Sequence, residues 1–162
     1  MTTLLRVATI GLALLLTGLD SRAQGFELIT AAEARLEARA EADAPPPPMT
    51  RGMPVTKPGQ PAIQVVSPSA PGGSVAAPVR IEVAFKPAPG TRIVPSTFRV
   101  LYGLLKIDLT DRLRRHATVT ESGVVVDHAQ VPEGQHRLIL QVADDQGNMA
   151  EQELRIRVGA AS

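Results

Sequence analysis

The sequence contains no cysteine and no tryptophan, and its 162 residues include one tyrosine and three phenylalanines. Without cysteine the chain can form neither a disulfide bond nor a lipid-modified cysteine, so core burial alone must hold a folded domain together. An aromatic content of 2% also argues against a carbohydrate-binding platform, because sugar rings are commonly gripped by aromatic faces.

The motifs of common catalytic and nucleotide-binding sites are missing as well. No serine stands in a G-x-S-x-G motif, and the sequence has no glycine-rich phosphate loop. The histidines His116, His128 and His136 include no pair at helical i, i+4 spacing, and no thiolate can complete a metal site. His136 begins an alternating apolar face, where we expect a structural histidine bonded to the backbone. We therefore predict a protein that is not an enzyme and holds no cofactor or metal ion.

The N-terminus has the three parts of a secretory signal peptide. Residues 1–6 carry a positive charge, residues 7–19 form an apolar run, and small residues at Ser21 and Ala23 match the positions that a signal peptidase recognises. The apolar run is shorter than the roughly 20 residues of a membrane span. We predict a signal peptide over residues 1–23 and a periplasmic or secreted protein without a stable membrane span, with an uncleaved anchor as the alternative.

Cleavage after Ala23 would leave a chain without net charge. The sequence has 17 basic and 16 acidic residues, and loss of Arg6, Arg22 and Asp20 leaves 15 of each. A neutral chain offers no electrostatic attraction to nucleic acid or to an anionic membrane surface. We therefore expect no nucleic acid among its partners.

A short helical segment is predicted at residues 24–44. Thr30 and Glu33 match a capping box, the following alanines, glutamates and arginines favour helix, and Pro45 ends it. The apolar stripe of this helix consists of alanines and Leu36 and is thin. A helix of this length is marginal without tertiary contacts, so it needs a docking site.

Two clusters are candidates for docking a partner. Phe26, Leu28 and Ile29 are strongly apolar, and they can fill a groove of the same chain, belong to a disordered tail, or bind another protein. A basic cluster around Arg112 and Arg115 can bind an acidic partner or phosphate, although a solvated helix face is the simpler explanation. The candidate partner-docking residues are Phe26, Leu28, Ile29, Arg112 and Arg115.

Prolines and glycines dominate residues 45–61, which begin with four consecutive prolines. This composition favours polyproline II structure, which acts as a semi-rigid spacer. A ligand for an aromatic-lined groove is the alternative. We predict a proline-rich linker over this range.

Short runs of alternating apolar and polar residues predict an all-β sandwich over residues 62–159. The clearest unit is a hairpin at residues 131–158, in which Leu138, Leu140 and Val142 share one face. A lone hairpin is marginal in water, so other strands must supply a second layer. We expect further strands at residues 63–66, 79–86, 97–102, 118–120 and 123–127, a turn at 71–74 and a short helix at 108–115.

Residues 63–158 resemble the immunoglobulin-like modules of bacterial exported and surface proteins. The resemblance rests on PVRIEV, on Asp-Leu-Thr at 108–110, on PEGQH leading into LILQV, and on ADDQGN before the last strand. It implies an antiparallel Ig-like β-sandwich but no particular activity, because such sandwiches serve many functions. We predict an exported non-enzymatic protein that interacts with another envelope protein or acts as a structural module of the envelope.

The stretch SPSAPGGSVAAPVRIEVAF is also similar to the opening strands of periplasmic copper-carrier sandwiches. Such carriers usually begin the mature chain with a histidine ligand, whereas this chain would begin with Gln24 and has no histidine before His116. Calcium, which binds six to eight oxygens, would need carboxylates from separate loops to converge. Those carboxylates would come from Asp108, Asp111 or Asp127 together with Asp144, Asp145 and Asn148. Binding of copper, calcium or a small ligand is the alternative function.

Overall fold

The computed structural model describes residues 25–45, 59–68 and 74–159. The predicted signal peptide and residues 46–58 of the predicted linker lie outside this part of the chain. The elements are α1 (Ala31–Asp43), β1 (Ala62–Ser67), β2 (Ser74–Ala76), β3 (Val79–Lys86), β4 (Ile93–Tyr102), β5 (Ile107–Asp108), α2 (Thr110–Arg114), β6 (Gly123–Ala129), β7 (Gly134–Asp144) and β8 (Met149–Gly159).

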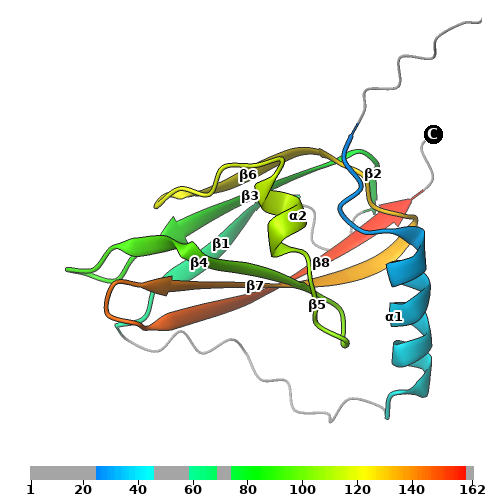
Figure 1. Ribbon diagram of the computed structural model, residues 1–162, viewed down its shortest axis with the longest axis horizontal. Coiled ribbons are helices and arrows are strands. Elements are labelled where there is room, and N and C mark those ends of the chain that lie inside the picture. Colours follow the sequence, from blue (N-terminus) through cyan, green and yellow to red (C-terminus); the bar gives the residue numbers. More distant parts are fainter. Residues whose placement is uncertain (1–24, 46–58, 69–73, 160–162) are drawn as a thin grey trace, which may run out of the picture.

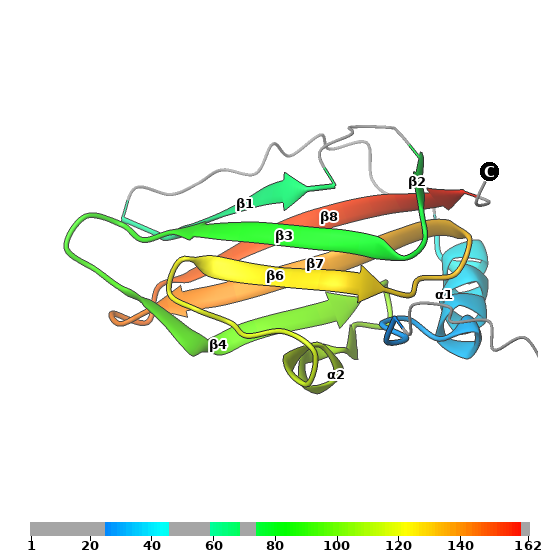
Figure 2. The ribbon, with the colours of Figure 1, turned by 90° about the horizontal axis from the view of Figure 1, so that it is seen from above.

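The strands form a β-sandwich of two sheets, which confirms the predicted fold class (Figure 1). The smaller sheet has the order β1-β3-β6 and the larger has the order β2-β8-β7-β4-β5. Figure 2 shows the smaller sheet lying over the larger one. The predicted hairpin is β7 and β8, paired from Gly134 opposite Val158 to Ala143 opposite Met149.

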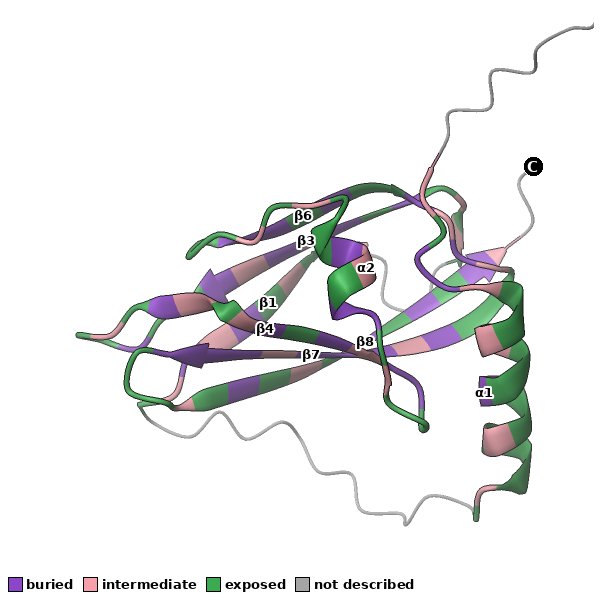
Figure 3. Cartoon of the chain, viewed as in Figure 1, coloured by how far each residue is buried: buried purple, intermediate pink, exposed green. Residues whose placement is uncertain are grey.

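Alternating side chains from the two sheets build the core. β3 buries Val79, Ile81, Val83 and Phe85, whereas Arg80 between them is exposed. In the facing sheet β7 buries its predicted apolar face and β8 buries Leu154, Ile156 and Val158. This alternation is visible along the strands in Figure 3. Each buried aliphatic side chain stabilises the fold by about 1.5–3 kcal/mol.

One strand pair of the sandwich is parallel, whereas the other pairs are antiparallel as predicted. Ser74, placed in a turn by the sequence pattern, begins β2, which runs parallel to β8 with Val75 opposite Val158. Three residues are too few to show an alternating pattern, and the preceding Pro71-Gly72-Gly73 indicated a turn. The predicted strand at residues 118–120 is a single bridge between Val119 and Val124.

The strand predicted at 97–102 ends at Tyr102 as predicted but begins earlier. β4 begins at Ile93 and contains an irregularity, in which the Thr97 hydroxyl donates to the Val94 carbonyl (2.6 Å) and accepts the Ala143 N–H (2.8 Å). Residues 103–106, which follow the predicted end of this strand, form a turn. Gly103 takes a positive φ of 68° there, a conformation that favours glycine.

The outer edge of β4 is covered by a side chain from α2. Arg114 Nη2 donates to the carbonyl oxygens of Pro95 (3.2 Å), Ser96 (2.9 Å) and Phe98 (3.1 Å). Exposed carbonyl groups on an edge strand are a template for pairing with another strand. The Arg114 side chain therefore contacts the edge of β4, although Arg114, like Arg115, is exposed to solvent.

Candidate interaction site at the N-terminal helix

Residues 26–29, which we call the strap, run beside the end of β6 and enter the core. The Gln130 N–H donates to the Phe26 carbonyl (2.8 Å), and the Leu28 N–H donates to the Gln130 carbonyl (3.0 Å). Leu28 and Ile29 are 0% exposed. The structure therefore shows the alternative in which Leu28 and Ile29 fill a groove of the same chain. Both side chains belong to the core of the sandwich.

Phe26 joins the strap to the segment that follows α2. Its ring is partly buried and stacks on the His116 ring, with 4.1 Å between centroids and 6° between planes. Stacked aromatic pairs contribute about 0.5–1.5 kcal/mol beyond the burial of their surface. Phe26 and His116 therefore hold the strap against the end of α2.

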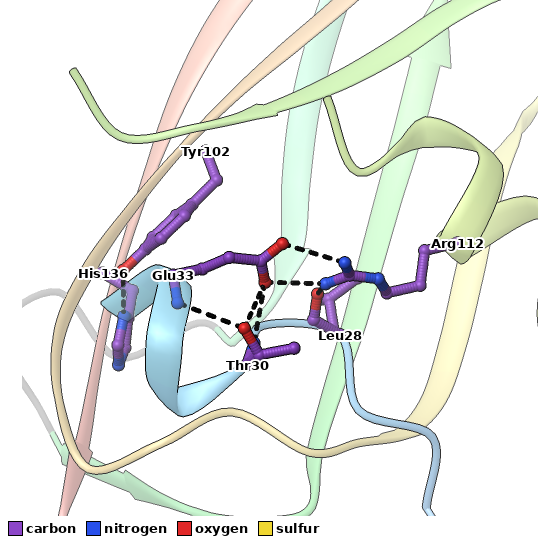
Figure 4. Close-up of polar contacts among 6 residues, drawn as sticks. All are labelled: Leu28, Thr30, Glu33, Tyr102, Arg112 and His136. Atoms are coloured by element: carbon purple, nitrogen blue, oxygen red, sulfur yellow. Dashed lines mark hydrogen bonds and ion pairs between the residues drawn. The ribbon is translucent and has the colours of Figure 1, made fainter. Parts of the chain in front are cut away.

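Arg112 lies between the strap, α1 and α2 (Figure 4). Its Nη1 donates to the Leu28 carbonyl (2.7 Å) and to Glu33 Oε2 (2.8 Å), and its Nη2 donates to Glu33 Oε1 (2.9 Å). Two parallel bonds to one carboxylate are the geometry for which arginine is suited. Arg112 is thus engaged within its own chain. Arg115 is exposed, and its Nε donates to the Asp111 carbonyl (3.2 Å).

Glu33 also completes the predicted capping box of α1, which the structure confirms. Its Oε2 accepts the Thr30 N–H (2.8 Å), and the Thr30 hydroxyl accepts the Glu33 N–H (3.1 Å). The hydrogen bonds from Arg112, opposed by burial and helped by Thr30, lower the pKa of Glu33 to about 2. One carboxylate therefore begins the helix and ties it to the sandwich.

Glu37 is the buried residue of α1, at 4% exposure. Its carboxylate accepts the N–H groups of Leu104 and, at 3.4 Å, of Leu105. Both N–H groups belong to the turn between β4 and β5. A Cβ atom on Gly103 would lie 1.9 Å from the Glu37 carboxyl carbon, so a side chain at this position would displace the Glu37 carboxylate.

On α1 the side chain of Glu37 is buried and that of Glu33 is partly buried, whereas the largest apolar residue, Leu36, is exposed. Leu36 is 51% exposed, and Ala34 is the partly buried apolar residue of α1 that packs against the core. Leu104 and Leu105 of the turn are 41% and 51% exposed. Three of the six large apolar side chains exposed in the described ranges are thus at this end of the molecule.

The buried pair Tyr102 and His136 lies near the inner side of α1 (Figure 4). His136 Nε2 lies 2.8 Å from the Pro132 carbonyl, which can only accept, so Nε2 carries the proton. The Tyr102 hydroxyl then donates to Nδ1 at 2.9 Å. Burial, together with the charge of Glu37, raises the pKa of Tyr102 to about 12, and burial lowers the pKa of His136. Both groups are neutral at neutral pH, which confirms His136 as a structural histidine.

Two of the carboxylates considered for calcium, Asp127 and Asp144, bind other groups of the protein. Asp144 accepts the N–H groups of Gln146 (3.0 Å) and Asn148 (2.8 Å), and these bonds shape the β7–β8 turn. Asp127 pairs with Arg80 at 2.6 Å. Within residues 25–45, 59–68 and 74–159, no group of three or more His, Cys, Asp or Glu side chains could hold a metal ion. No helix in these ranges has the length and apolar character needed to cross a membrane.

Sequence reasoning missed Glu37 and the turn that it binds. A signal was present, because Glu33, Glu37 and Glu41 recur at i, i+4 and i+8 and so share one helix face. The groups that bind the carboxylates of Glu33 and Glu37 lie 67 to 79 residues further along the chain. A local pattern therefore cannot show that the acidic face points inward.

The ion pair between Glu33 and Arg112 makes stability depend on pH. Because the pKa of Glu33 falls from 4.5 to about 2 on folding, its stabilisation is present above about pH 4.5 and is lost as the pH falls toward 2. We expect the wild type to exceed Glu33→Gln in unfolding free energy by about 2 kcal/mol at neutral pH, and by almost nothing near pH ~2. Urea denaturation of both proteins across this range measures the difference. A difference that is constant with pH would contradict the ion pair.

Comparison with known proteins does not assign the chain to a family. No family model matches the sequence, and no curated protein matches it. Among solved structures, the chain is similar to CopC from Methylosinus trichosporium OB3b, with a TM-score of 0.42 and 17% identity over 62% of this chain and 96% of that one. A similarity of this size establishes neither family nor function.

Proposed function

We propose that the protein is an exported, non-enzymatic interaction module, and that the outer face of α1 with the adjoining turn binds another envelope protein. The orientation of α1 is the observation that carries this proposal. An amphipathic helix on a soluble domain normally buries its apolar residues. This helix buries Glu37 and exposes Leu36.

While α1 is docked, the positions of Leu36, Leu104 and Leu105 are set by the contact between α1 and the β4–β5 turn. Leu36 precedes Glu37, whose carboxylate holds the N–H groups of Leu104 and Leu105. The same contact therefore positions helix and turn relative to one another. Apolar groups on a pre-organised surface lose little conformational freedom on binding, which favours their use as interface anchors.

Site-specific photo-crosslinking in the native cell envelope tests the proposal. A photoreactive amino acid replaces Leu36, Leu105 or, as the control, Met149 in the full-length protein. Met149 is 56% exposed and follows the β7–β8 turn, at the end of the sandwich away from α1 (Figure 1). We expect an adduct of one defined mass from positions 36 and 105 and none from 149. Equal adducts at all three positions, or none at 36 and 105, would refute this surface.

A further inference from the structure

The strap and α1 are attached to the sandwich in different ways. The strap buries Leu28 and Ile29 completely and exchanges backbone hydrogen bonds with Gln130. α1 buries no large apolar side chain, and its buried residue is Glu37. Taking a carboxylate out of water costs free energy that its new partners offset only in part. α1 should therefore detach at a lower free energy than the strap, as local openings of proteins commonly do.

Beneath α1 the sandwich carries two groups that bind carboxylates. The guanidinium of Arg112 binds Glu33, and the N–H groups of Leu104 and Leu105 bind Glu37. Residues four apart lie on the same helix face, one turn from each other. The spacing of the two groups is therefore matched to a helix with carboxylates at i and i+4.

The strap keeps one of these groups in place when α1 is absent. Arg112 Nη1 also donates to the carbonyl oxygen of Leu28, a residue that is 0% exposed. The turn that supplies the N–H groups is fixed independently by the Gly103 N–H, which donates to the Arg137 carbonyl (2.9 Å). The site therefore does not depend on α1 for its geometry.

We propose that Arg112 and the N–H groups of Leu104 and Leu105 form a binding site for an acidic helix of a partner protein, with α1 as its built-in competitor. The ligand is a helix with two carboxylates at i and i+4. It displaces α1 from Thr30 onward, while the strap stays docked. This site is on the inner side of α1, whereas the proposed function concerns its outer face. An experiment can therefore contradict one proposal without contradicting the other.

A binding experiment with full-length protein tests the site. The probe is a fluorescently labelled peptide with the sequence of residues 30–44, TAAEARLEARAEADA. The protein variant Glu33→Gln/Glu37→Gln keeps the shapes of the two side chains but removes their charges. Its own α1 therefore binds Arg112 and the turn more weakly. We expect this variant to bind the peptide at least about tenfold more tightly than the wild type, because the competitor is removed.

The matched control is a peptide with the same two glutamine substitutions. We expect it to bind the double variant about tenfold more weakly than the acidic peptide, because hydrogen bonds to a charged carboxylate are the stronger ones. Equal binding of the acidic peptide to wild type and double variant would overturn the proposal. Equal binding of the two peptides to the double variant would do so as well.

Hydrogen exchange on the wild type gives a second test that needs no variant. If α1 opens while the strap stays docked, the amides of Leu104 and Leu105 will exchange at least about tenfold faster than the amide of Leu28. Equal protection of the three amides would show that α1 and the strap leave together. That result would contradict the proposal that α1 detaches while the strap stays docked, and it does not depend on whether the double variant folds.

Discussion

Replacement of Leu28 by alanine is expected to lower the free energy of unfolding by about 2–5 kcal/mol, the range for deletion of a buried leucine side chain. Leu28 is 0% exposed and belongs to the core formed by both sheets. The substitution leaves a cavity between strap and sheets, because the surrounding strands are held by their own hydrogen bonds and relax only in part. Denaturant unfolding of the full-length protein at neutral pH measures the loss.

Leu36→Ala is the matched control, because it removes the same atoms from a side chain that is 51% exposed. Its effect is expected to stay within about 0.5 kcal/mol, as for most surface substitutions. Similar losses for the two variants would show that the strap does not contribute to the core. The hypothesis that residues 26–29 dock onto another protein would then regain its basis.

Arg112→Ala is expected to lower the free energy of unfolding by about 2–4 kcal/mol. The substitution leaves the Glu33 carboxylate, whose side chain is 16% exposed, without its charged partner, and it removes the donor to the Leu28 carbonyl. The pKa of Glu33, followed by NMR titration, should rise from about 2 toward its ordinary value.

Arg115→Ala tests whether loss of any arginine in this cluster has the same effect. Arg115 is exposed, and its side chain donates to the carbonyl oxygen of Asp111 in the same helical segment. A change within about 0.5 kcal/mol and an unaltered Glu33 titration are expected. A loss as large as that of Arg112→Ala would mean that net charge, and not the pairing with Glu33, stabilises this end of the molecule.

The parts of the fold that follow from local chemistry were predictable. Large apolar residues recur at every second position along most of β3 and of the hairpin β7–β8, and the turn at residues 144–148 contains the residue types that favour reversal. The start of α1 follows from Thr30 and Glu33, whose reciprocal hydrogen bonds span three residues. In each case the interacting groups are close in sequence or repeat with the period of the element.

The remainder depends on groups that are distant in the sequence. β2 exists because β8, more than 80 residues away, offers a free edge, and three residues carry no period of their own. The turn at 103–106 follows the predicted end of the strand at residue 102, but the sequence does not show what holds the turn in place. Only the buried carboxylate of Glu37 shows why these backbone N–H groups leave the sheet.

The candidate docking residues were separated by the same kind of long-range contact. Leu28, Ile29 and Arg112 hold the chain to itself, Phe26 stacks on His116, and Arg115 is exposed. Composition identified the apolar and basic clusters correctly. It could not show that they contact one another, because Arg112 and Leu28 are 84 residues apart.

The hydrogen bonds from Arg114 to three carbonyl oxygens of β4 affect whether two molecules can pair through this edge of the sheet. A positive charge fixed over that flank of β4 satisfies the acceptors that an incoming strand would need, and it repels the same flank of a second molecule. We therefore expect the guanidinium group of Arg114 to disfavour sheet-to-sheet pairing of two molecules along this side of β4.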